Sequence, residues 1–427
     1  MEFLPIAAMF AFFALNIPVA FGLILSGLTY FLFLCDGMPM DMLVQGMIAQ
    51  TSSFTMLAIP LFIAAGVAMT YGGISQSLLD LADTLVGHRI GGLGHVNVLL
   101  STFMGGCSGS ATADCAFESK ILVPEMVKRG YSKGFSAAIT SASSIITPII
   151  PPGICLIIYA TAANVAIGDM FMAGYSPGIL LCLALMIATH FIAKAKRFPP
   201  SRQKRASVGE ILEQARKSAW ALVLPILIIT SLRFGWITPT ECGAMTLAYS
   251  ILVGFFIYRK LKFGHLPRVL VESTLNTATV MLILAAANMF ARYLTWEGLP
   301  HRLTEFITGT TSNPVVFLLM VNLLMIVMGM FIDTAAALII LPPLLVPIAK
   351  AMGIDPLHLG IVMCMQDTFG GITPPFGVLM FTSTTITRTK VSDYIREGWP
   401  LILTCLAVIL LVTFVPALSL WPMRLFG

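Results

Sequence analysis

The sequence predicts an all-α polytopic membrane protein with an inverted-topology repeat, two re-entrant helical hairpins and two discontinuous helices. Three observations support this fold class: long apolar segments, an internal repeat with reversed charge bias, and matching helix-breaking clusters in both repeats. Of the 427 residues, 57% are hydrophobic and 11% are charged, with a mean hydropathy of +0.91. Soluble domains carry about 25% charged residues, so this chain could not cover a water-facing surface. Residues 3–35 contain no charged side chain, and about 20 such residues can cross a bilayer.

Several other classes of protein are disfavoured. The N-terminal apolar segment is longer than the roughly 7–15 residues of a signal-peptide core, so we expect a retained span, either continuous or broken near Asn16-Ile17-Pro18. The cysteines form no CxxC pair and the histidines occur singly, so no metal centre, disulfide framework or cofactor is expected. The sequence has no GxxxxGK[ST] loop and is not expected to hydrolyse ATP. The net charge of +5 is attributed to membrane topology, and no nucleic-acid partner is expected.

Basic residues predict the orientation of the chain, because Lys and Arg are retained in cytoplasmic loops. One cluster lies within residues 194–217 and a second within 259–268. Two apolar spans separate the clusters and are joined by residues 234–239. Both clusters are therefore predicted to be cytoplasmic, and the 234–239 turn and the C-terminus to lie outside.

An internal repeat relates residues 57–180 to 280–402. Leu122-Val123-Pro124 recurs as Leu345-Val346-Pro347, and after one inserted residue Gly153 matches Gly377. The distribution of basic residues reverses between the copies. Residues 112–135 are basic, whereas Lys350 is the only basic residue of their counterpart, 335–358. Residues 388–400 are basic, whereas their counterpart, 164–176, contains no Lys or Arg. Equivalent ends are thus predicted on opposite sides of the membrane, as in secondary transporters.

Each repeat has two segments in which a helix cannot continue. Residues 105–113 are rich in Gly and Ser between short apolar stretches, and residues 329–336 are their counterpart. Both are predicted to be tips of re-entrant hairpins. The second pair, 146–153 and 370–377, is rich in Pro and Gly, and proline removes a backbone donor and clashes with the preceding turn. Unwound backbone at membrane depth is tolerated where it lines a cavity.

Carbonyl and hydroxyl oxygens at such breaks can bind a small hard cation, and helix N-termini attract anions. Each hairpin tip is therefore predicted to form a sodium site with one broken helix. The alternative is that Gly, Ser and Pro only permit close helix packing. The proposed sodium ligands are Ser108, Gly109, Ser110, Thr147, Ile150 and Pro152 in the first repeat, and Asp333, Thr334, Gly370, Gly371 and Thr373 in the second. The proposed substrate contacts are Ser108, Pro151, Arg292, Thr373 and Pro374.

The segments 105–114 and 370–377 resemble the large membrane subunit of tripartite ATP-independent periplasmic (TRAP) transporters. Pro151-Pro152-Gly153 and Asp333-Thr334-Ala335-Ala336 fit the same pattern, and the resemblance covers nearly the whole chain. It implies an elevator-type transporter that couples uptake to sodium. It also implies two partners, a small four-helix membrane subunit and a soluble periplasmic substrate-binding protein. The small subunit is expected to be a separate polypeptide.

Two charged residues, Asp333 and Arg292, have competing interpretations. Asp333 is either a sodium ligand or the cap of the following helix. Arg292 either binds a substrate carboxylate in bidentate geometry or extends to the membrane interface. Asp114 and Glu118, four residues apart and near Lys120, are predicted to form a salt-bridge network at the hairpin end.

The predicted function is secondary active, sodium-coupled import of a small organic acid anion, of the C4-dicarboxylate or sialic acid type, across the bacterial inner membrane. The alternative is a bilayer-embedded enzyme or a scaffold subunit of a membrane complex; the chain shows no recognisable catalytic spacing, so it is not expected to be an enzyme.

The predicted segments are 1–52 (N-terminal scaffold span), 53–193 (first inverted repeat, hairpin 92–130 and broken helix 132–165), 194–217 (basic cytoplasmic linker), 218–268 (scaffold spans), 269–402 (second repeat, hairpin 314–352 and broken helix 357–387) and 399–427 (C-terminal span).

Overall fold

The computed structural model describes residues 4–15, 17–34, 40–52, 54–310, 313–331 and 334–426. These residues form helices and turns, and none of them forms a β-strand. The all-α class predicted from the sequence is therefore confirmed. Within the described ranges, five helices are long and apolar enough to cross a membrane, or up to seven if each bent helix pair counts as one span. The chain is thus a multi-pass membrane protein.

The N-terminal segment, predicted as one span over residues 1–52, contains three helices. The second helix starts directly after Pro18, whose ring cannot continue a preceding helix. Further on, a bend of 67° at Gly73, which has a φ of +81°, separates α4 from α5. The helices here are α1 (Leu4–Ala14), α2 (Val19–Phe33), α3 (Met40–Thr51), a 3₁₀ turn (Phe54–Leu57), α4 (Ala58–Gly72) and α5 (Ile74–Val86).

The next helices form a hairpin, an interrupted helix and one long helix. They are α6 (Gly92–Gly105), α7 (Ala111–Lys128), α8 (Lys133–Ser144), α9 (Ile154–Ala163) and α10 (Ile167–Lys196). The chain leaves helical geometry between α6 and α7, in the Gly- and Ser-rich segment, and between α8 and α9, in the segment that contains Pro148, Pro151 and Pro152. A helix of 30 residues such as α10 is about 45 Å long, enough to cross the hydrocarbon core obliquely.

The non-helical linker is shorter than the predicted range 194–217. It spans residues 197–207, because α10 continues to Lys196 and a capping box of Ser207 and Glu210 starts α11 at Val208. The helices that follow are α11 (Val208–Arg233), α12 (Pro239–Leu252), a π-helical turn (Val253–Ile257), a 3₁₀ turn (Phe263–His265), α13 (Leu266–Trp296) and α14 (Leu299–Thr310).

The second repeat again contains a hairpin followed by an interrupted helix. A bend of 51° before Pro342 divides the second arm of its hairpin. The predicted C-terminal span, 399–427, differs from the structure, in which α20 begins at Val391 and a separate short helix follows Pro416. The helices are α15 (Pro314–Phe331), α16 (Thr334–Ile340), α17 (Pro342–Ala351), α18 (Pro356–Gly370), α19 (Val378–Thr387), α20 (Val391–Phe414) and α21 (Ala417–Phe426).

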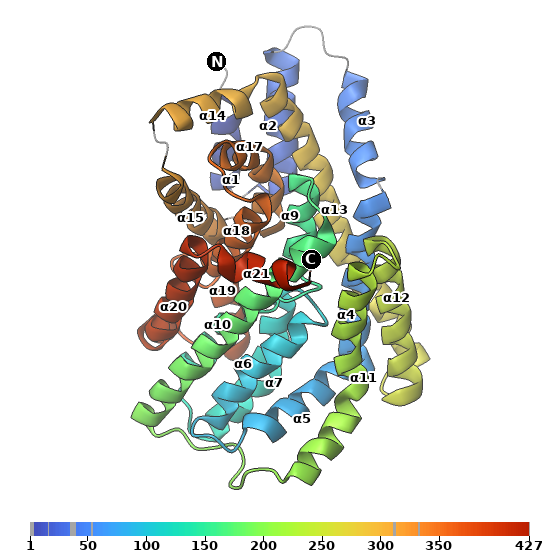
Figure 1. Ribbon diagram of the computed structural model, residues 1–427, viewed down its shortest axis with the longest axis vertical. Helices are drawn as coiled ribbons and strands as arrows, with labels where there is room; N and C mark the ends of the chain where they lie inside the picture. The colour runs from blue at the N-terminus through green and yellow to red at the C-terminus, as the bar shows by residue number, and fades with distance from the viewer. Residues whose placement is uncertain are drawn as a thin grey trace.

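The two repeats are interlocked. In the first repeat α9 packs against α16 and α18 of the second, and in the second repeat α19 packs against α7 and α8 of the first. The long helices cross in the same way, since α10 packs on α18 and α20 packs on α8. Exchanging the repeats leaves this pattern of contacts unchanged. Figure 1 shows α5 and α14, which precede the two hairpins, at opposite ends of the molecule.

The orientation prediction can be tested at two exposed positions. Gln203 in the linker and Trp236 in the α11–α12 turn are both exposed, and α11, with 26 residues, separates them by about 39 Å. A membrane-impermeant thiol reagent applied from outside should label Trp236→Cys and not Gln203→Cys. The seven described cysteines are buried, which keeps background labelling low. The opposite labelling pattern would overturn the predicted orientation.

Candidate functional site

The first hairpin tip, residues 106–110, is joined to α7 and to the start of α9 by hydrogen bonds. Gly109 has a φ of +58°, in the left-handed region that glycine adopts at least cost. Ser110 caps α7, since its Oγ accepts a hydrogen bond from the Ala113 amide at 3.4 Å. The Gly109 carbonyl oxygen accepts a hydrogen bond from the Ile154 amide at 3.2 Å. The tip is thereby joined to the start of α9.

The first helix break, residues 145–153, is buried throughout and lies directly against this tip. A Cβ atom added to Gly109 would lie 2.3 Å from the Pro152 carbonyl oxygen, and one added to Gly105 would lie 2.7 Å from Ile150 Cβ. No side chain fits at those distances, so both glycines are required for the close approach. The structure thus brings the tip together with a break that contains Thr147, Ile150, Pro151 and Pro152.

The two serines of the tip differ in their surroundings. Ser108 is buried and its backbone lies against α4, where a Cβ added to Gly66 would be 3.2 Å from Ser108 Cα. Its Oγ donates to the Met104 carbonyl at 3.4 Å. Ser110 is half-buried, and its Oγ lies 3.2 Å from Thr112 Oγ1. Of the two tip hydroxyls, that of Ser110 is therefore the more exposed.

Asp114 and Glu118 do not form the salt-bridge network at the hairpin end that the sequence predicted. Both side chains are completely buried on α7, and neither forms an ion pair with a basic group among the described residues. That prediction was wrong because α6 and α8 enclose this face of α7.

The buried carboxylates are held by hydroxyl groups. Thr147 Oγ1 donates to Asp114 Oδ2 at 2.7 Å, and Ser101 Oγ donates to Glu118 Oε1 at 3.0 Å. Asp114 Oδ1 has no hydrogen-bond donor among the described residues. A buried carboxylate is costly unless it is paired or hydrogen-bonded, so a cation beside Asp114 would stabilise it. Asp114 is thus a candidate ligand next to the first break, through its direct bond to Thr147.

The second hairpin and the second break cross at two glycines. A Cβ added to Gly329 would lie 2.2 Å from the Asp367 carbonyl oxygen, and one added to Gly370 would lie 2.7 Å from Gly329 Cα. Thr334 begins α16, which packs against α18 and α9. Asp333 lies outside the described residues, so its role as a ligand stays a prediction.

The second break is more open than the first. Gly370 and Gly371 are buried, Thr373 and Pro374 are half-buried, and Pro375 and Phe376 are exposed. The Gly371 carbonyl oxygen accepts hydrogen bonds from the amides of Leu379 at 2.8 Å and Met380 at 3.1 Å. Thr373 Oγ1 donates to the Phe369 carbonyl at 2.9 Å. The exposed turn at 375–376 leaves this side of the site accessible.

Arg292 lies near the end of α13, which packs against α3 and α16. Its guanidinium lies against α3, where a Cβ added to Gly46 would be 2.5 Å from Arg292 Nε, and Nε donates to Asn288 Oδ1 at 3.4 Å. Its proposed role as a substrate contact gains no support from this position.

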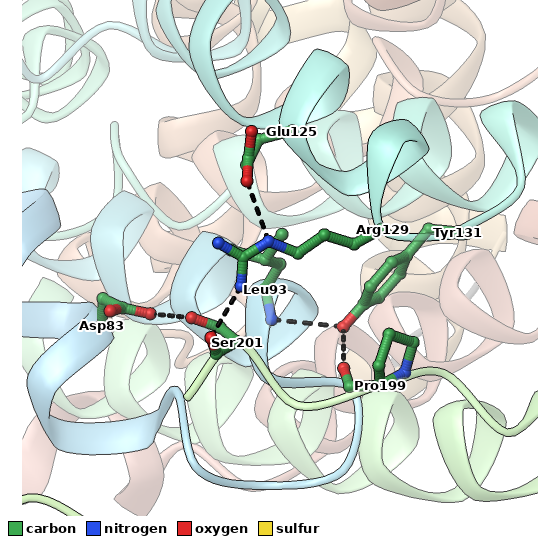
Figure 2. A network of polar contacts seen from close by, with 7 residues as sticks. All are labelled: Asp83, Leu93, Glu125, Arg129, Tyr131, Pro199 and Ser201. Carbon is green, nitrogen blue, oxygen red and sulfur yellow. Dashed lines mark hydrogen bonds and ion pairs between the residues drawn. The ribbon is translucent and has the colours of Figure 1, made fainter. Parts of the chain in front are cut away.

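The linker after α10 is fixed to the base of the first hairpin, as Figure 2 shows. Tyr131 OH donates to the Pro199 carbonyl at 2.7 Å and accepts from the Leu93 amide at 3.3 Å. Burial raises the pKa of Tyr131 to about 12, so this donor keeps its proton at physiological pH. Arg129 Nη1 donates to the Ser201 carbonyl at 2.6 Å and Arg129 Nε pairs with Glu125 at 2.8 Å, while Ser201 Oγ donates to Asp83. The linker therefore connects α5, α6 and α7.

The chain matches known transporter proteins along nearly its whole length. The family described as "Tripartite ATP-independent periplasmic transporter, DctM component" matches residues 6–418. The chain is 38% identical over 367 residues to the C4-dicarboxylate TRAP transporter large permease protein DctM of Pseudomonas aeruginosa, covering 86% of each chain. It is 34% identical over 411 residues to the sialic acid TRAP transporter large permease protein SiaM of Vibrio cholerae, covering 96% of each.

A solved structure supports the fold independently. The YdaH transporter of Alcanivorax borkumensis superimposes with a TM-score of 0.64 at 16% identity, covering 88% of each chain. At that identity the likeness concerns the fold alone. The family match covers nearly the whole chain, and its members are transporter permeases, not enzymes. The chain belongs to the DctM family, the large permease component of the tripartite ATP-independent periplasmic transporters.

Proposed function

We propose that this chain imports a small organic acid anion across the bacterial inner membrane by sodium coupling. The observation that carries the proposal is the contact of the first tip with the first break, at Gly109 and Pro152, together with the crossing of Gly329 and Gly370 in the second repeat. Both crossings bring helix ends close to unwound backbone, and carbonyl oxygens of unwound backbone can bind a cation.

The proposed ions bind on either side of the substrate. The first sodium ion would be held by oxygens of the tip at 108–110 and of the break at 147–152, with Asp114 as the charged group. The second would be held by Asp333 and Thr334 together with 370–373. The half-buried Ser110 and the open second break, with Thr373 and Pro374, then lie on the accessible side, where an anion can enter.

Two relatives support the proposed substrate class. The two named above are permeases for C4-dicarboxylates and for sialic acid, so the proposed substrate is a small carboxylate. Transport by an elevator movement would carry the interlocked hairpins and broken helices past α1–α4 and α11–α13. A small membrane subunit and a periplasmic binding protein are the proposed partners.

Uptake into proteoliposomes tests this proposal. The chain co-reconstituted with its small membrane subunit should accumulate a labelled carboxylate only with an inward sodium gradient and a substrate-loaded binding protein. The chain alone should accumulate little, because substrate delivery is assigned to the binding protein. A potassium gradient of equal size is the control. Equal uptake with both gradients would refute sodium coupling, and no uptake by the complete system would favour a scaffold role.

A further inference from the structure

The structure contains a basic pocket away from the candidate transport site. A cavity of about 470 Å³ lies between α7, α8 and the end of α19. Three cations line it, Lys120, Lys133 and Arg388, one from each of these elements. We propose that this pocket binds the phosphate headgroup of an anionic phospholipid.

The charge of the pocket is uncompensated. None of its lining residues is acidic, and its three cations form no ion pair among the described residues. Neighbouring cations behave differently, since Arg129 pairs with Glu125 and Lys196 pairs with Glu397. Three cations held around one cavity repel each other unless an anion lies between them. A phosphate group fits this arrangement.

The walls of the pocket favour a lipid over a soluble anion. Val123, Val127 and Ile386 form an apolar lining beside the three cations. The exposed Phe381 of α19 lies seven residues, about two helical turns, before Arg388, which ends this helix. This places apolar surface for acyl chains on one side of the pocket and cations for the headgroup on the other.

The pocket opens on the side of the membrane where anionic lipids attract basic protein. Lys133 follows Ser132 and Tyr131, and Tyr131 is hydrogen-bonded to Pro199 of the linker. The pocket therefore lies at the same end of the molecule as the linker, which is predicted to be cytoplasmic. Basic pockets between membrane helices on this side bind anionic headgroups.

Binding can be measured as the anisotropy of a fluorescent phosphatidylglycerol with the full chain in neutral detergent. The wild type should bind phosphatidylglycerol and should not bind phosphatidylcholine with the same acyl chains. The triple variant Lys120→Gln/Lys133→Gln/Arg388→Gln should bind roughly a hundredfold more weakly, because each cation near an anionic headgroup contributes about one kcal/mol.

The matched control is Lys194→Gln/Lys204→Gln/Arg216→Gln, which removes the same charge from exposed positions outside the pocket and should bind like the wild type. The double variant Lys120→Arg/Lys133→Arg should also bind, which separates loss of the site from misfolding. Equal weakening in both triple variants would overturn the proposal, as would equal binding of the two lipids. If inorganic phosphate displaces the probe as effectively as phosphatidylglycerol does, the site takes soluble anions and the assignment to lipid is wrong. None of these outcomes bears on sodium-driven transport.

Discussion

Gly109→Ala should reduce sodium-driven uptake at least tenfold at matched membrane expression. The added Cβ would lie 2.3 Å from the Pro152 carbonyl oxygen and 3.2 Å from both Gly153 Cα and the Ile154 nitrogen. All three are backbone atoms that no rotamer change can move. The left-handed φ of +58° adds about 1–2 kcal/mol of strain for a non-glycine residue. The tip must therefore separate from the first break, and the sodium site assigned to their contact is lost.

Gly130→Ala provides the control for this variant. Gly130 follows the same hairpin and also has a left-handed φ, +90°, but a Cβ added there meets nothing within 4 Å. It carries a similar backbone strain without the collision. Uptake that falls equally in the two variants would show that destabilisation of the hairpin, and not contact between tip and break, controls transport. Measuring uptake against sodium concentration for both variants decides between these causes.

The helix interruptions could be predicted from the sequence because they depend on local residue types. Proline cannot continue a helix, and glycine permits both the positive φ at Gly109 and the close crossing at Gly329. The all-α membrane class followed from the low charge content and the long apolar segments. The contacts between the repeats did not, because helical periodicity does not specify that α9 packs on α16 or that α19 packs on α7. Those pairings depend on the complete three-dimensional arrangement.

The position of the buried carboxylates illustrates the same limit. An acidic pair at i and i+4 with a lysine nearby is also the pattern of an exposed, salt-bridged helix. The distinguishing signal was the helical face: Asp114 and Glu118 share theirs with Leu122 and Met126, which are also buried, whereas Lys120 is exposed. Arg292 shows the reverse case, since its chemistry suits a carboxylate but its position against Gly46 comes only from the packing of α13 on α3.

Asp114→Asn should raise the sodium concentration for half-maximal uptake by roughly a hundredfold or more. Asparagine has the same shape and can still accept the hydrogen bond from Thr147 Oγ1, so the first break keeps its structure. The variant loses the negative charge, and a unit charge 4 Å from a cation contributes roughly 4 kcal/mol at an effective dielectric constant near 20. The measurement is uptake against sodium concentration, together with the increase in melting temperature that sodium gives the purified protein.

Glu118→Gln replaces an equally buried carboxyl group on the same helix and serves as the matched control. Glu118 Oε1 accepts from Ser101 of α6, and Glu118 has no bond to Thr147 or to any other residue of the break. If Asp114 is a ligand, sodium dependence should change much less in Glu118→Gln than in Asp114→Asn, even if both variants are less stable. Comparable shifts would show that the total buried charge of α7 attracts the ion. Unchanged sodium dependence in both would remove Asp114 from the site and leave its bond to Thr147 as a purely structural link between α7 and the break.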